Sequence, residues 1–532
     1  MMLRRVPKND SVFMLCIGAV AAVAATYAYW SLIPDVLHYS TWDYWFEGDP
    51  PAAVSQMSER WSAHHHRTSH HPLFSLLVSM PVQTLQALPG IGTVGAVGVA
   101  IAVVAALSSG ILFATFRLIG LRRLDAGVFT ALAASSSSAI FWFPVPESYS
   151  FGALSIVAAI AVAALHERRF LVPNWLFGAA SAATLSFTST NWTVGLAMLS
   201  ASLQRRKAVI IAVASALVVA GLWVAQKVVY PLSDNPLNLT TDAESIYLFN
   251  EEALGLWAKA RAFFIHSVVM PEVGSAYGFR LSVQGASIAG SGALHAAATA
   301  LWIALLTAGG WAAMRLRSSS TMRVLLLSLL GQLVLHLVFG IETFLYSAHF
   351  GPLLVTTCAF AAVTPLRRFV MPVAGTLAIL CAVNNLERFG AAADGLRARF
   401  ERERAFTAAL KELTLPGMPI ICGREALAGR GEGKVERGPI AVEPRVEIIL
   451  EGDPDTCAFL FSEVELQRSG WILVHEDWSI DAVETLRKRG ARYFVTPYEY
   501  GMNSLPTFAA EMDRRYQRLD THSGLTFYDL AE

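Results

Sequence analysis

Long runs of apolar residues recur along the first 390 positions of the chain, separated by short polar joints. A run of roughly 18 or more apolar residues, at a rise of about 1.5 Å per residue, is long enough to cross a hydrocarbon core about 30 Å thick. The pattern therefore predicts an α-helical polytopic membrane protein. We place about eleven transmembrane helices, near residues 11–33, 92–116, 124–144, 149–166, 170–188, 190–204, 208–231, 293–314, 322–340, 345–364 and 369–387.

Basic and acidic joints alternate almost strictly between the apolar runs. Basic residues gather near positions 4–5, 117–123, 168–169, 205–207, 315–323 and 367–368, and acidic residues near 43–59, 147, 234–252 and 342. Because Lys and Arg are enriched in cytoplasmic loops, we predict that the basic joints lie in the cytoplasm. The N-terminus is then cytoplasmic and the C-terminus extracytoplasmic, and the compact loops favour a bacterial inner membrane.

Two long joints fall on the predicted outer face, over residues 34–91 and 232–292. The first contains the apolar stretch 73–88, which is short, includes Pro81, and would reverse every later loop if it crossed the membrane. We therefore predict a re-entrant or interfacial helix there, which is tolerated where protein or a cavity satisfies its backbone. The second contains an amphipathic pattern over 244–269, typical of a helix lying on a membrane surface.

The composition changes after residue 390, which predicts a transmembrane domain over 1–390 and a soluble extracytoplasmic domain over 391–532. In the second domain, short β-like runs such as WILVHED and ARYFVTPYEY flank the helical pattern SIDAVETLRKRG. Strand, helix and strand in that order predict a small α/β domain. No phosphate-binding glycine motif precedes its helices, so a structural or interaction role is favoured over nucleotide binding.

Composition supports a membrane protein and adds little about its partners. Hydrophobic residues make up 54% of the 532 residues and charged residues 15%, against about 25% charged residues in a typical soluble domain. The formal net charge is zero, so bulk charge gives no indication of a nucleic-acid partner.

The first outer loop carries a concentration of carboxylates, Asp43, Glu47 and Asp49. Glu47 and Asp49 are one residue apart and are held by a turn at Gly48 and Pro50, so their side chains can converge on one ligand. Such a pair can hold a divalent cation, Mg²⁺ or Mn²⁺, or one member can take a proton from an attacking hydroxyl group. Each carboxylate taken alone is also consistent with a solvated loop residue.

The same loop supplies the cations Arg60, Arg67, His70 and His71. Arg can bind phosphate oxygens in a bidentate manner, and His can donate to a departing phosphate. A carboxylate base beside these cations fits a reaction in which a hydroxyl group attacks and a phosphate leaves. The alternative is a histidine metal site, but HHHRTSHH (64–71) lacks a His pair at i and i+4 with an acid between them.

Two further acidic joints lie among aromatic residues. Glu147 follows the third predicted span, and Glu342, Tyr346 and His349 are spaced i, i+4 and i+7, which predicts one face of the tenth helix near its outer end. An ionisable residue at a membrane boundary is costly unless it faces a cavity or a partner, so these residues are candidates for substrate binding. A paired structural cluster is the alternative. Arg280 adds a cation in the second outer loop, where lipid contact is the alternative role.

An acidic pair after the first span, followed by the His-Pro segment of HPLFSLL, resembles the GT-C superfamily of integral-membrane glycosyltransferases, particularly its mannosyl- and aminoarabinose-transferase branches. The resemblance covers roughly residues 10–390. It implies a sugar donor linked to polyprenyl phosphate and transfer to an acceptor on the outer face without a nucleotide. It also implies inversion at the sugar carbon, with a carboxylate as general base.

The resemblance carries roles over to individual positions. Glu47 and Asp49 fall on the acidic pair of the family, with Asp43 close by, and Glu147 falls on the second-loop acid, where it would orient the acceptor or a metal. The phosphate would be held by Arg67, His70 and His71. The chain departs from the family in having Glu-x-Asp for the pair and Glu for the second-loop acid, which leaves the general base open between Asp49 and Glu47.

There are two alternative functions: a transporter, flippase or polysaccharide polymerase that uses the same outer cavity, and an inactive scaffold or assembly partner that works through its C-terminal domain. A transporter, flippase or polysaccharide polymerase should carry ionisable residues deep within its spans and show inverted repeats, and neither is visible in the sequence. A catalytically inactive scaffold should turn its outer-loop carboxylates away from any cavity. The favoured prediction is an inverting glycosyltransferase whose partners are a polyprenyl-phosphate sugar donor, a lipid, glycan or protein acceptor and membrane lipid, without nucleic acid.

Overall fold

The computed structural model describes residues 8–39, 45–235, 248, 255–276, 280–287, 291–413, 420–424, 440–442, 470–474, 478–496, 505–519 and 526–531. Asp43 lies outside the described residues. By its contacts the chain divides into two compact units, one formed by Met1–Ser275 with Arg280–Ala393 and the other by Ala276–Phe279 with Asp394–Glu532.

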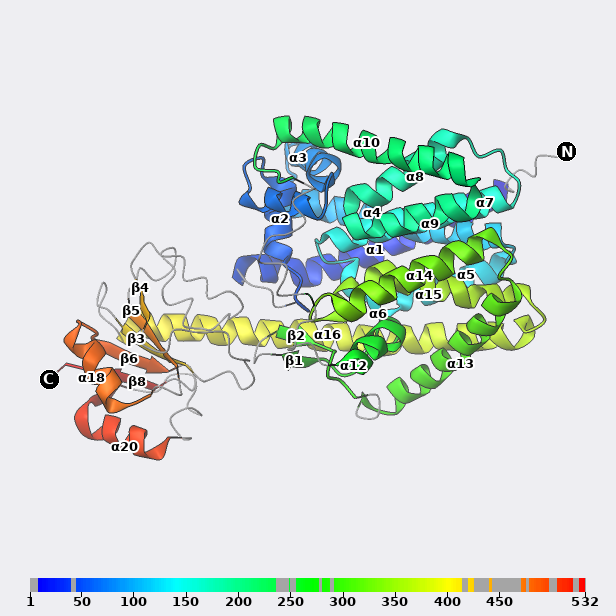
Figure 1. Ribbon diagram of the computed structural model, residues 1–532. Helices are drawn as coiled ribbons and strands as arrows, with labels where there is room; N and C mark the ends of the chain where they lie inside the picture. The colour runs from blue at the N-terminus through cyan, green and yellow to red at the C-terminus, as the bar shows by residue number, and fades with distance from the viewer. Residues whose placement is uncertain are drawn as a thin grey trace. The chain divides into compact units, whose positions relative to one another are not determined.

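Long helices that lie roughly parallel to one another form most of the first unit (Figure 1). Within the described residues, eight helical stretches are long and apolar enough to cross a membrane. Each of them overlaps a predicted span. They are formed by α1 (Lys8–Tyr39), α4 (Thr93–Ile119), α7 (Ser148–Glu167), α10 (Arg205–Val229), α13 (Ala293–Arg315), α14 (Ser320–Val338), α15 (Ser347–Ala359) with its flanking 3₁₀ helices η6 (Thr343–Tyr346) and η7 (Phe360–Val363), and α16 (Arg367–Leu413).

The predicted span over 124–144 is divided in the structure. It holds α5 (Arg123–Ser135) and α6 (Ser137–Trp142). Ser136 separates them: its backbone is extended, and its hydroxyl accepts a hydrogen bond from the N–H of Ala139, which caps the start of α6. A side-chain cap satisfies an N–H that the helix itself cannot. The serine-rich sequence therefore starts a new helix where the apolar pattern indicated a continuous one.

The next two predicted spans, 170–188 and 190–204, form a short helical hairpin. It consists of α8 (Asn174–Phe187) and α9 (Trp192–Ser202), joined by the 3₁₀ turn η3 (Ser189–Asn191). Helices of 14 and 11 residues measure about 21 and 16 Å at 1.5 Å per residue, less than a core about 30 Å thick. The predicted count of eleven spans is therefore not confirmed.

The stretch 73–88 forms a short helix and not a span. It contains a π-helical turn, η2 (Ser75–Ser79), that continues into α3 (Met80–Gln86), and α2 (Pro50–Ser58) packs against it at one end of the bundle (Figure 1). The amide group of Gln226 in α10 fixes its start through two 2.8 Å hydrogen bonds to the backbone. The short helix agrees with the prediction, and its place at a membrane surface stays a prediction.

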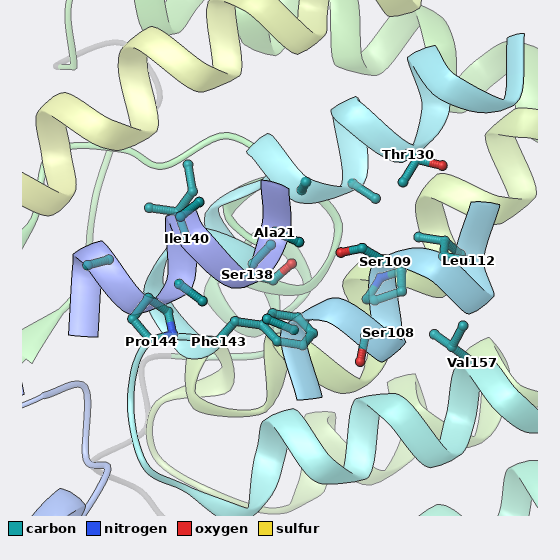
Figure 2. Close-up of a pocket in the computed structure, with 18 of the residues that line it drawn as sticks. Ala21, Ser108, Ser109, Leu112, Thr130, Ser138, Ile140, Phe143, Pro144 and Val157 are labelled. Carbon is teal, nitrogen blue, oxygen red and sulfur yellow. The ribbon is translucent and has the colours of Figure 1, made fainter. Parts of the chain in front are cut away.

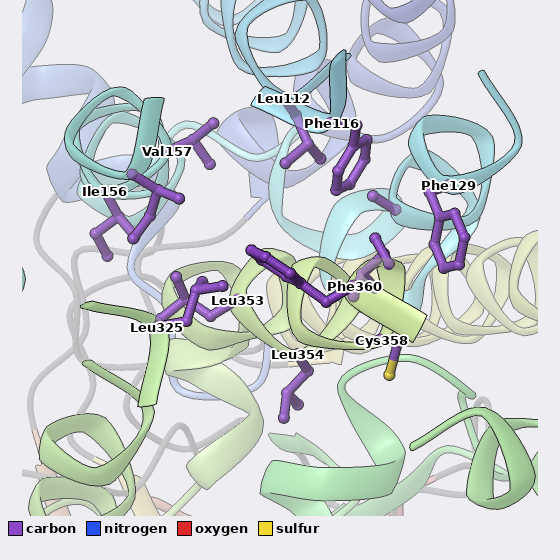
Figure 3. Packing of buried hydrophobic residues seen from close by; sticks show 14 of the residues in the cluster. Leu112, Phe116, Phe129, Ile156, Val157, Leu325, Leu353, Leu354, Cys358 and Phe360 are labelled. Atoms are coloured by element: carbon purple, nitrogen blue, oxygen red, sulfur yellow. The ribbon is translucent and has the colours of Figure 1, made fainter. Parts of the chain in front are cut away.

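A hydrophobic core lies between α4, α5, α7, α14 and α15. Figure 3 shows side chains from these helices meeting in the core, among them Leu112, Phe129, Val157 and Leu325. Helices approach most closely where one residue is small: a Cβ added to Gly309 of α13 would lie 2.8 Å from the Cα of Cys358. Such close approach at small residues is common between membrane helices, because apolar burial does not drive their association.

Ion pairs tie together the helix ends that carry the basic joints. Asp10 in α1 accepts 2.9 Å hydrogen bonds from Arg117 and Arg123, and Asp125 accepts two from Arg367, at 2.7 and 2.8 Å. Basic joints that are far apart in the sequence therefore gather at one end of the first unit, as the alternation of charge leads one to expect. The orientation of that end towards the cytoplasm stays a prediction.

The second long joint contains several short elements. The structure describes α12 (Leu256–Arg261), a π-helical turn η4 (Ala262–His266) and a two-stranded sheet of β1 (Gly274–Ala276) and β2 (Arg280–Ser282). Part of the helix predicted over 244–269 is thus present, and most of its first half lies outside the described residues.

The second unit contains a six-stranded sheet with helices packed on it, in agreement with the predicted α/β domain (Figure 1). The strand order is β4-β5-β3-β6-β8-β7, in which β3 pairs in parallel with β5 and β6 and the other pairs are antiparallel. Phe494, Phe508 and Tyr528 contribute to its hydrophobic core. The elements are β3 (Ile420–Arg424), β4 (Ile440–Val442), β5 (Gly470–Val474), α18 (Ile480–Lys488), β6 (Tyr493–Thr496), α20 (Pro506–Arg515), β7 (Gln517–Leu519) and β8 (Thr526–Asp529).

Candidate functional site

A cavity of about 280 Å³ lies where the first loop meets the ends of α7, α14 and α15. Six residues that the sequence singled out line it, namely Glu47, Arg67, His70, His71, Tyr346 and His349. The other lining residues are Tyr149, Thr188, Ser189, Thr190, Leu335, His336, Phe339, Ile341 and Leu345. Charged groups of the first loop and polar groups of the helices therefore share one space.

A second cavity, of about 120 Å³, lies among α1, α4, α5 and α6 and differs in character (Figure 2). Its wall is mostly apolar, with many alanines and a few hydroxyl groups such as those of Ser108, Ser109 and Thr130. Among the described residues that line it there is no Asp, Glu, His, Lys or Arg. The first cavity is therefore the candidate functional site.

Glu47 reaches the first cavity from a tight turn over residues 45–48. The N–H of Gly48 donates to the carbonyl oxygen of Trp45 at 2.8 Å, and Phe46 and Glu47 both have left-handed backbones, with φ of 50° and 64°. Two consecutive positive φ angles are the pattern of a type I′ turn, which residues other than Gly, Asn and Asp rarely adopt. Backbone strain of this kind persists only where the surroundings hold it, and it is common at functional sites.

Aromatic packing holds this turn in its strained form. The rings of Trp45 and Phe46 are buried, and their centroids lie 5.7 and 5.6 Å from that of Phe141. The indole N–H of Trp45 also donates to the carbonyl oxygen of Phe141 at 3.1 Å. Gly48 packs against Trp142, where an added Cβ would lie 3.1 Å from the indole ring. These buried aromatic contacts restrict the backbone of the turn.

Asp49 has a structural role in this arrangement. It is the N-cap of α2, and its Oδ1 accepts a hydrogen bond from the N–H of Ala52 at 3.1 Å. Its own N–H donates to Oε1 of Glu147 at 2.8 Å. Asp49 is not among the residues that line the cavity. The two carboxylates of the predicted pair therefore have different surroundings.

Glu147 joins the first loop to the start of α7. It is 1% exposed, and its carboxylate accepts hydrogen bonds from the N–H of Asp49, from the N–H of Ser148 at 3.1 Å and from Nη2 of Arg67 at 2.8 Å. Burial raises the pKa of Glu147, and the positive charge of Arg67 opposes that shift. Glu147 is outside the lining of the cavity. Its hydrogen bonds hold the first loop against the start of α7.

Arg67 brings a permanent positive charge to the cavity. It belongs to the 3₁₀ helix η1 (Ala63–Ser69), and while its Nη2 binds Glu147, its Nη1 is buried without a hydrogen-bond partner. Burial lowers its pKa, but the charges of Glu147 and Asp49 outweigh this effect and hold the pKa above its ordinary value. A charged guanidinium with an unused nitrogen is well suited to bind an anion.

His71 links the first loop to the helices. Its Nδ1 lies 2.7 Å from the carbonyl oxygen of Phe187, and its Nε2 lies 3.1 Å from Oγ of Ser148. Because a carbonyl oxygen can only accept, Nδ1 carries the proton and Nε2 accepts from the hydroxyl. Burial, with a further contribution from Arg67, lowers the pKa of His71 well below its ordinary value. The predicted donation from His71 to a phosphate is not supported by this geometry. His70 lines the cavity as well.

Glu342 precedes the helix that was predicted to carry it. It is the N-cap of η6, where its carboxylate accepts hydrogen bonds from the N–H of Phe344 and from the hydroxyl of Ser282 in β2. The predicted helical face is therefore wrong for its first member, because the backbone of a capping residue is extended. Tyr346 and His349 line the cavity, and Glu342 does not.

Glu342 should make the stability of the protein depend on pH. Burial raises its pKa to about 7, the hydrogen bond from Ser282 opposes this shift, and the negative charge of Glu47 adds to it. The unfolded chain releases the same proton near pH 4.5, so between these values the folded state binds more protons and stability falls as the pH rises. We expect the thermal unfolding temperature of the purified protein to fall from about pH 5 to 7, and Glu342→Gln to remove part of this slope. Equal slopes for the two proteins would contradict the assignment.

Of the remaining predicted residues, Arg60 is the one whose side chain the structure describes. Arg60 donates from Nε to the carbonyl oxygen of Val229 at 3.0 Å and lies beside the exposed ring of Trp61, outside the cavity lining. Arg280 belongs to β2, and its side chain lies outside the described part of the chain, as does Asp43 altogether.

Sequence reasoning missed polar residues that line the cavity from the helices. His336 lies near the end of α14, and Thr188, Ser189 and Thr190 lie in the joint between α8 and α9. A histidine inside an apolar run is a signal that could have found His336, because ionisable side chains within membrane helices are rare unless they have a function. The three small polar residues of the joint carry no comparable signal.

Comparison with known proteins finds no matching family model and no matching curated protein. Similar solved structures include ArnT from Cupriavidus metallidurans bound to undecaprenyl phosphate, with 12% identity over 99% of both chains and a TM-score of 0.47. The archaeal oligosaccharyltransferase AglB from Archaeoglobus fulgidus is 12% identical over 99% of this chain and 75% of its own, with a TM-score of 0.41. The arabinofuranosyltransferase AftD from Mycobacteria is 13% identical over 97% of this chain and 40% of its own, with a TM-score of 0.41. All three are glycosyltransferases of the superfamily that the sequence resembles. Because these TM-scores are below 0.5, the assignment of a function rests on the site itself.

Proposed function

We propose that this protein is a membrane glycosyltransferase that moves a sugar from a polyprenyl-phosphate donor to an acceptor hydroxyl group on the extracytoplasmic face. One observation carries the proposal: Glu47 and Arg67 line the same cavity, and one nitrogen of the Arg67 guanidinium has no hydrogen-bond partner. A carboxylate can accept a proton, and a guanidinium can bind a phosphate. An inactive scaffold would turn its loop carboxylates away from any cavity, and Glu47 does the opposite.

In the proposed reaction the acceptor hydroxyl oxygen attacks the anomeric carbon of the sugar from the side opposite the phosphate. Glu47 takes the hydroxyl proton as the new C–O bond forms. The bond between the anomeric carbon and the phosphate oxygen breaks, its electron pair passes to the polyprenyl phosphate, and the configuration at the anomeric carbon inverts. Arg67 binds the phosphate throughout and stabilises the negative charge that develops on it.

Glu47 is preferred over Asp49 as the base because the two carboxylates differ in their surroundings. Asp49 gives one oxygen to the N–H of Ala52 and is outside the cavity lining, whereas Glu47 lines the cavity from a strained turn. Glu147 binds both the N–H of Asp49 and the guanidinium of Arg67. Asp49 and Glu147 therefore act as positioning residues for the base and for the phosphate-binding cation.

A divalent cation, Mg²⁺ or Mn²⁺, is a further part of the proposal. Within the described residues no group of three or more His, Cys, Asp or Glu side chains is arranged to hold a metal. Mg²⁺, however, is often bound by only one or two carboxylates together with phosphate oxygens of a substrate. Glu47, which lines the cavity, would supply one carboxylate ligand to such a cation, whereas the predicted second ligand, Asp49, caps α2 outside the cavity lining. The cation would add positive charge beside the leaving phosphate.

The position of the cavity suggests how the donor enters. The cavity lies at the ends of helices that are long enough to cross a membrane, so a polyprenyl chain can stay in the bilayer while its phosphate reaches Arg67. We assign this end to the periplasmic side of a bacterial inner membrane, opposite the helix ends that carry the basic joints. The acceptor is a lipid, a glycan or a protein, and no nucleic acid takes part.

The direct test is a transfer assay with the full chain in liposomes. Radiolabelled decaprenyl phosphates carrying glucose, mannose, galactose or arabinose are incubated with the protein and a membrane extract as the source of acceptors, with and without EDTA. We expect label to move to an acceptor with release of decaprenyl phosphate, and EDTA to slow the transfer. If all label stays on the donors while the protein binds decaprenyl phosphate, the transferase is contradicted and a transporter is favoured.

A further inference from the structure

Three side chains from two elements form a chain of hydrogen bonds beside the cavity. The Nε2 of Gln332 donates to Oδ1 of Asn191 at 3.0 Å, and the Oε1 of Gln332 lies 3.0 Å from Nε2 of His336. Because this oxygen can only accept, Nε2 of His336 carries the proton. All three side chains are buried, with exposed fractions of 2% or less.

Polar atoms without a hydrogen-bond partner lie at both ends of this chain of hydrogen bonds. Nδ1 of His336 and Nδ2 of Asn191 are buried without a hydrogen-bond partner, and so is Nε2 of the neighbouring His349, which is 1% exposed. His336 and His349 both line the cavity. Buried polar atoms without a partner are uncommon in folded proteins, so three of them beside one cavity indicate a missing partner such as a ligand or an ordered water.

Two of these polar atoms, Nε2 of His349 and Nδ2 of Asn191, lie against the same glycine of α7. A Cβ added to Gly152 of α7 would lie 2.5 Å from Nε2 of His349 and 2.8 Å from Nδ2 of Asn191, so both nitrogens approach this glycine. The ring of Tyr149 contacts those of His349 and Tyr346, with centroids 5.6 and 5.5 Å apart. The helix side of the cavity therefore carries polar side chains from α7, α14, α15 and the α8–α9 joint, set among apolar residues such as Leu335 and Ile341.

We propose that His336 and His349, which both line the cavity, form a subsite that binds the hydroxyl groups of a neutral sugar, an inference that rests on the proposed function. Asn191 is outside the cavity lining and acts as a positioning residue, because it holds His336 through Gln332. Nδ1 of His336 is an acceptor, and a sugar hydroxyl group can donate to it. Because a hydroxyl group both donates and accepts, it can also satisfy Nε2 of His349, the other histidine nitrogen without a partner beside the cavity.

The distribution of charge separates this subsite from the phosphate site. Glu47 is the one carboxylate among the described residues that line the cavity, and it lies on the first loop together with Arg67. A sugar that carries an ammonium or carboxylate group would need an opposite charge beside it, because an unpaired charge is very costly to bury. The described polar residues that line the helix side offer imidazole and hydroxyl groups, which suit the hydroxyl groups of a neutral sugar.

The test compares donor lipids with and without a sugar. The full-length protein in nanodiscs is titrated with decaprenyl phosphate, with decaprenyl phosphates of glucose, mannose, galactose or arabinose, and with those of glucosamine or glucuronate. We expect at least one neutral sugar lipid to bind about tenfold more tightly than decaprenyl phosphate, since each satisfied buried polar group contributes about this much. His336→Phe, which keeps the ring stack on Tyr346, and His349→Phe should each remove most of this difference while the Kd for decaprenyl phosphate stays unchanged.

His166→Phe is the matched control, because His166 lies at the far end of α7, outside the cavity lining, where it contacts Phe177. It should change neither constant. Asn191→Leu provides a second variant if a histidine variant does not fold. A wild-type protein that prefers no neutral sugar lipid, or variants that shift the constants for sugar-bearing and sugar-free lipids equally, would overturn the inference and leave the transferase standing. A wild-type protein that does not bind decaprenyl phosphate would overturn both.

Discussion

Replacing Glu47 by Gln is expected to lower the rate of sugar transfer by about 10²–10⁴-fold, the usual loss when a general base is removed. Gln has nearly the size of Glu but cannot take the proton of the acceptor hydroxyl. Because Arg67 keeps its contact with Glu147, the Kd for decaprenyl phosphate should not change. The measurement is the single-turnover transfer rate of the reconstituted full-length protein, together with lipid binding.

Asp49→Asn is the control for this experiment. Asn and Asp are nearly equal as N-caps, so the variant keeps the hydrogen bond to the N–H of Ala52, and its backbone N–H still donates to Glu147. We expect it to retain most of the transfer rate. The reverse pattern, with Asp49→Asn inactive and Glu47→Gln active, would move the base to Asp49. Loss of transfer in both folded variants, restored by added Mg²⁺ in either, would mean that the two carboxylates share a cation and would contradict the separate roles given to them.

The long helices could be predicted because their apolar runs are long enough to cross the hydrocarbon core of a membrane. The short hairpin of α8 and α9 could not, because contacts distant in the sequence hold its tip. The N–H of Ser189 donates to the carbonyl oxygen of His70 at 2.9 Å, and the N–H of Leu73 donates to that of Ser186, also at 2.9 Å. The apolar pattern of residues 170–204 does not show these hydrogen bonds to the first loop. It therefore indicated two spans, whereas the structure has two shorter helices held by that loop.

The sequence predicted which residue types form the site, but it did not predict which role each residue has. Glu47 and Asp49 look equivalent in the sequence, yet one lines the cavity and the other caps a helix. Arg67 and Glu147 were both candidates for substrate contact, and the structure shows that they also bind each other across 80 residues of sequence. Such pairing depends on how the first loop folds onto the start of α7, which local patterns do not encode. His336 was missed because its apolar neighbours fit a span.

Glu147→Gln is expected to reduce the free energy of unfolding by about 3–5 kcal/mol, because removing one partner of a buried ion pair leaves the other charge unpaired. The side chains of Glu147 and Arg67 are 1% and 17% exposed. Gln has one acceptor oxygen, so it can accept from the N–H of Asp49 or from that of Ser148 but not from both, and it cannot neutralise the guanidinium. The measurement is the shift in thermal unfolding of the detergent-purified protein. Asp394→Asn, in an exposed pair with Arg397, is the control and should change little.

Combining Glu147→Gln with Arg67→Met separates the charge of this pair from its other contacts. Replacing a buried ion pair by neutral groups of similar volume is often neutral or stabilising, so the double variant should regain much of the stability that Glu147→Gln loses. A double variant no more stable than Glu147→Gln would mean that the hydrogen bonds from backbone N–H groups, and not the ion pair, hold the first loop. The double variant should still bind decaprenyl phosphate poorly, because the phosphate has lost its charged partner, and binding equal to wild type would remove Arg67 from the phosphate site. If both expectations hold, the two terminal nitrogens of the Arg67 guanidinium have different roles. Nη2 stabilises the fold through Glu147, and Nη1 binds the phosphate of the donor.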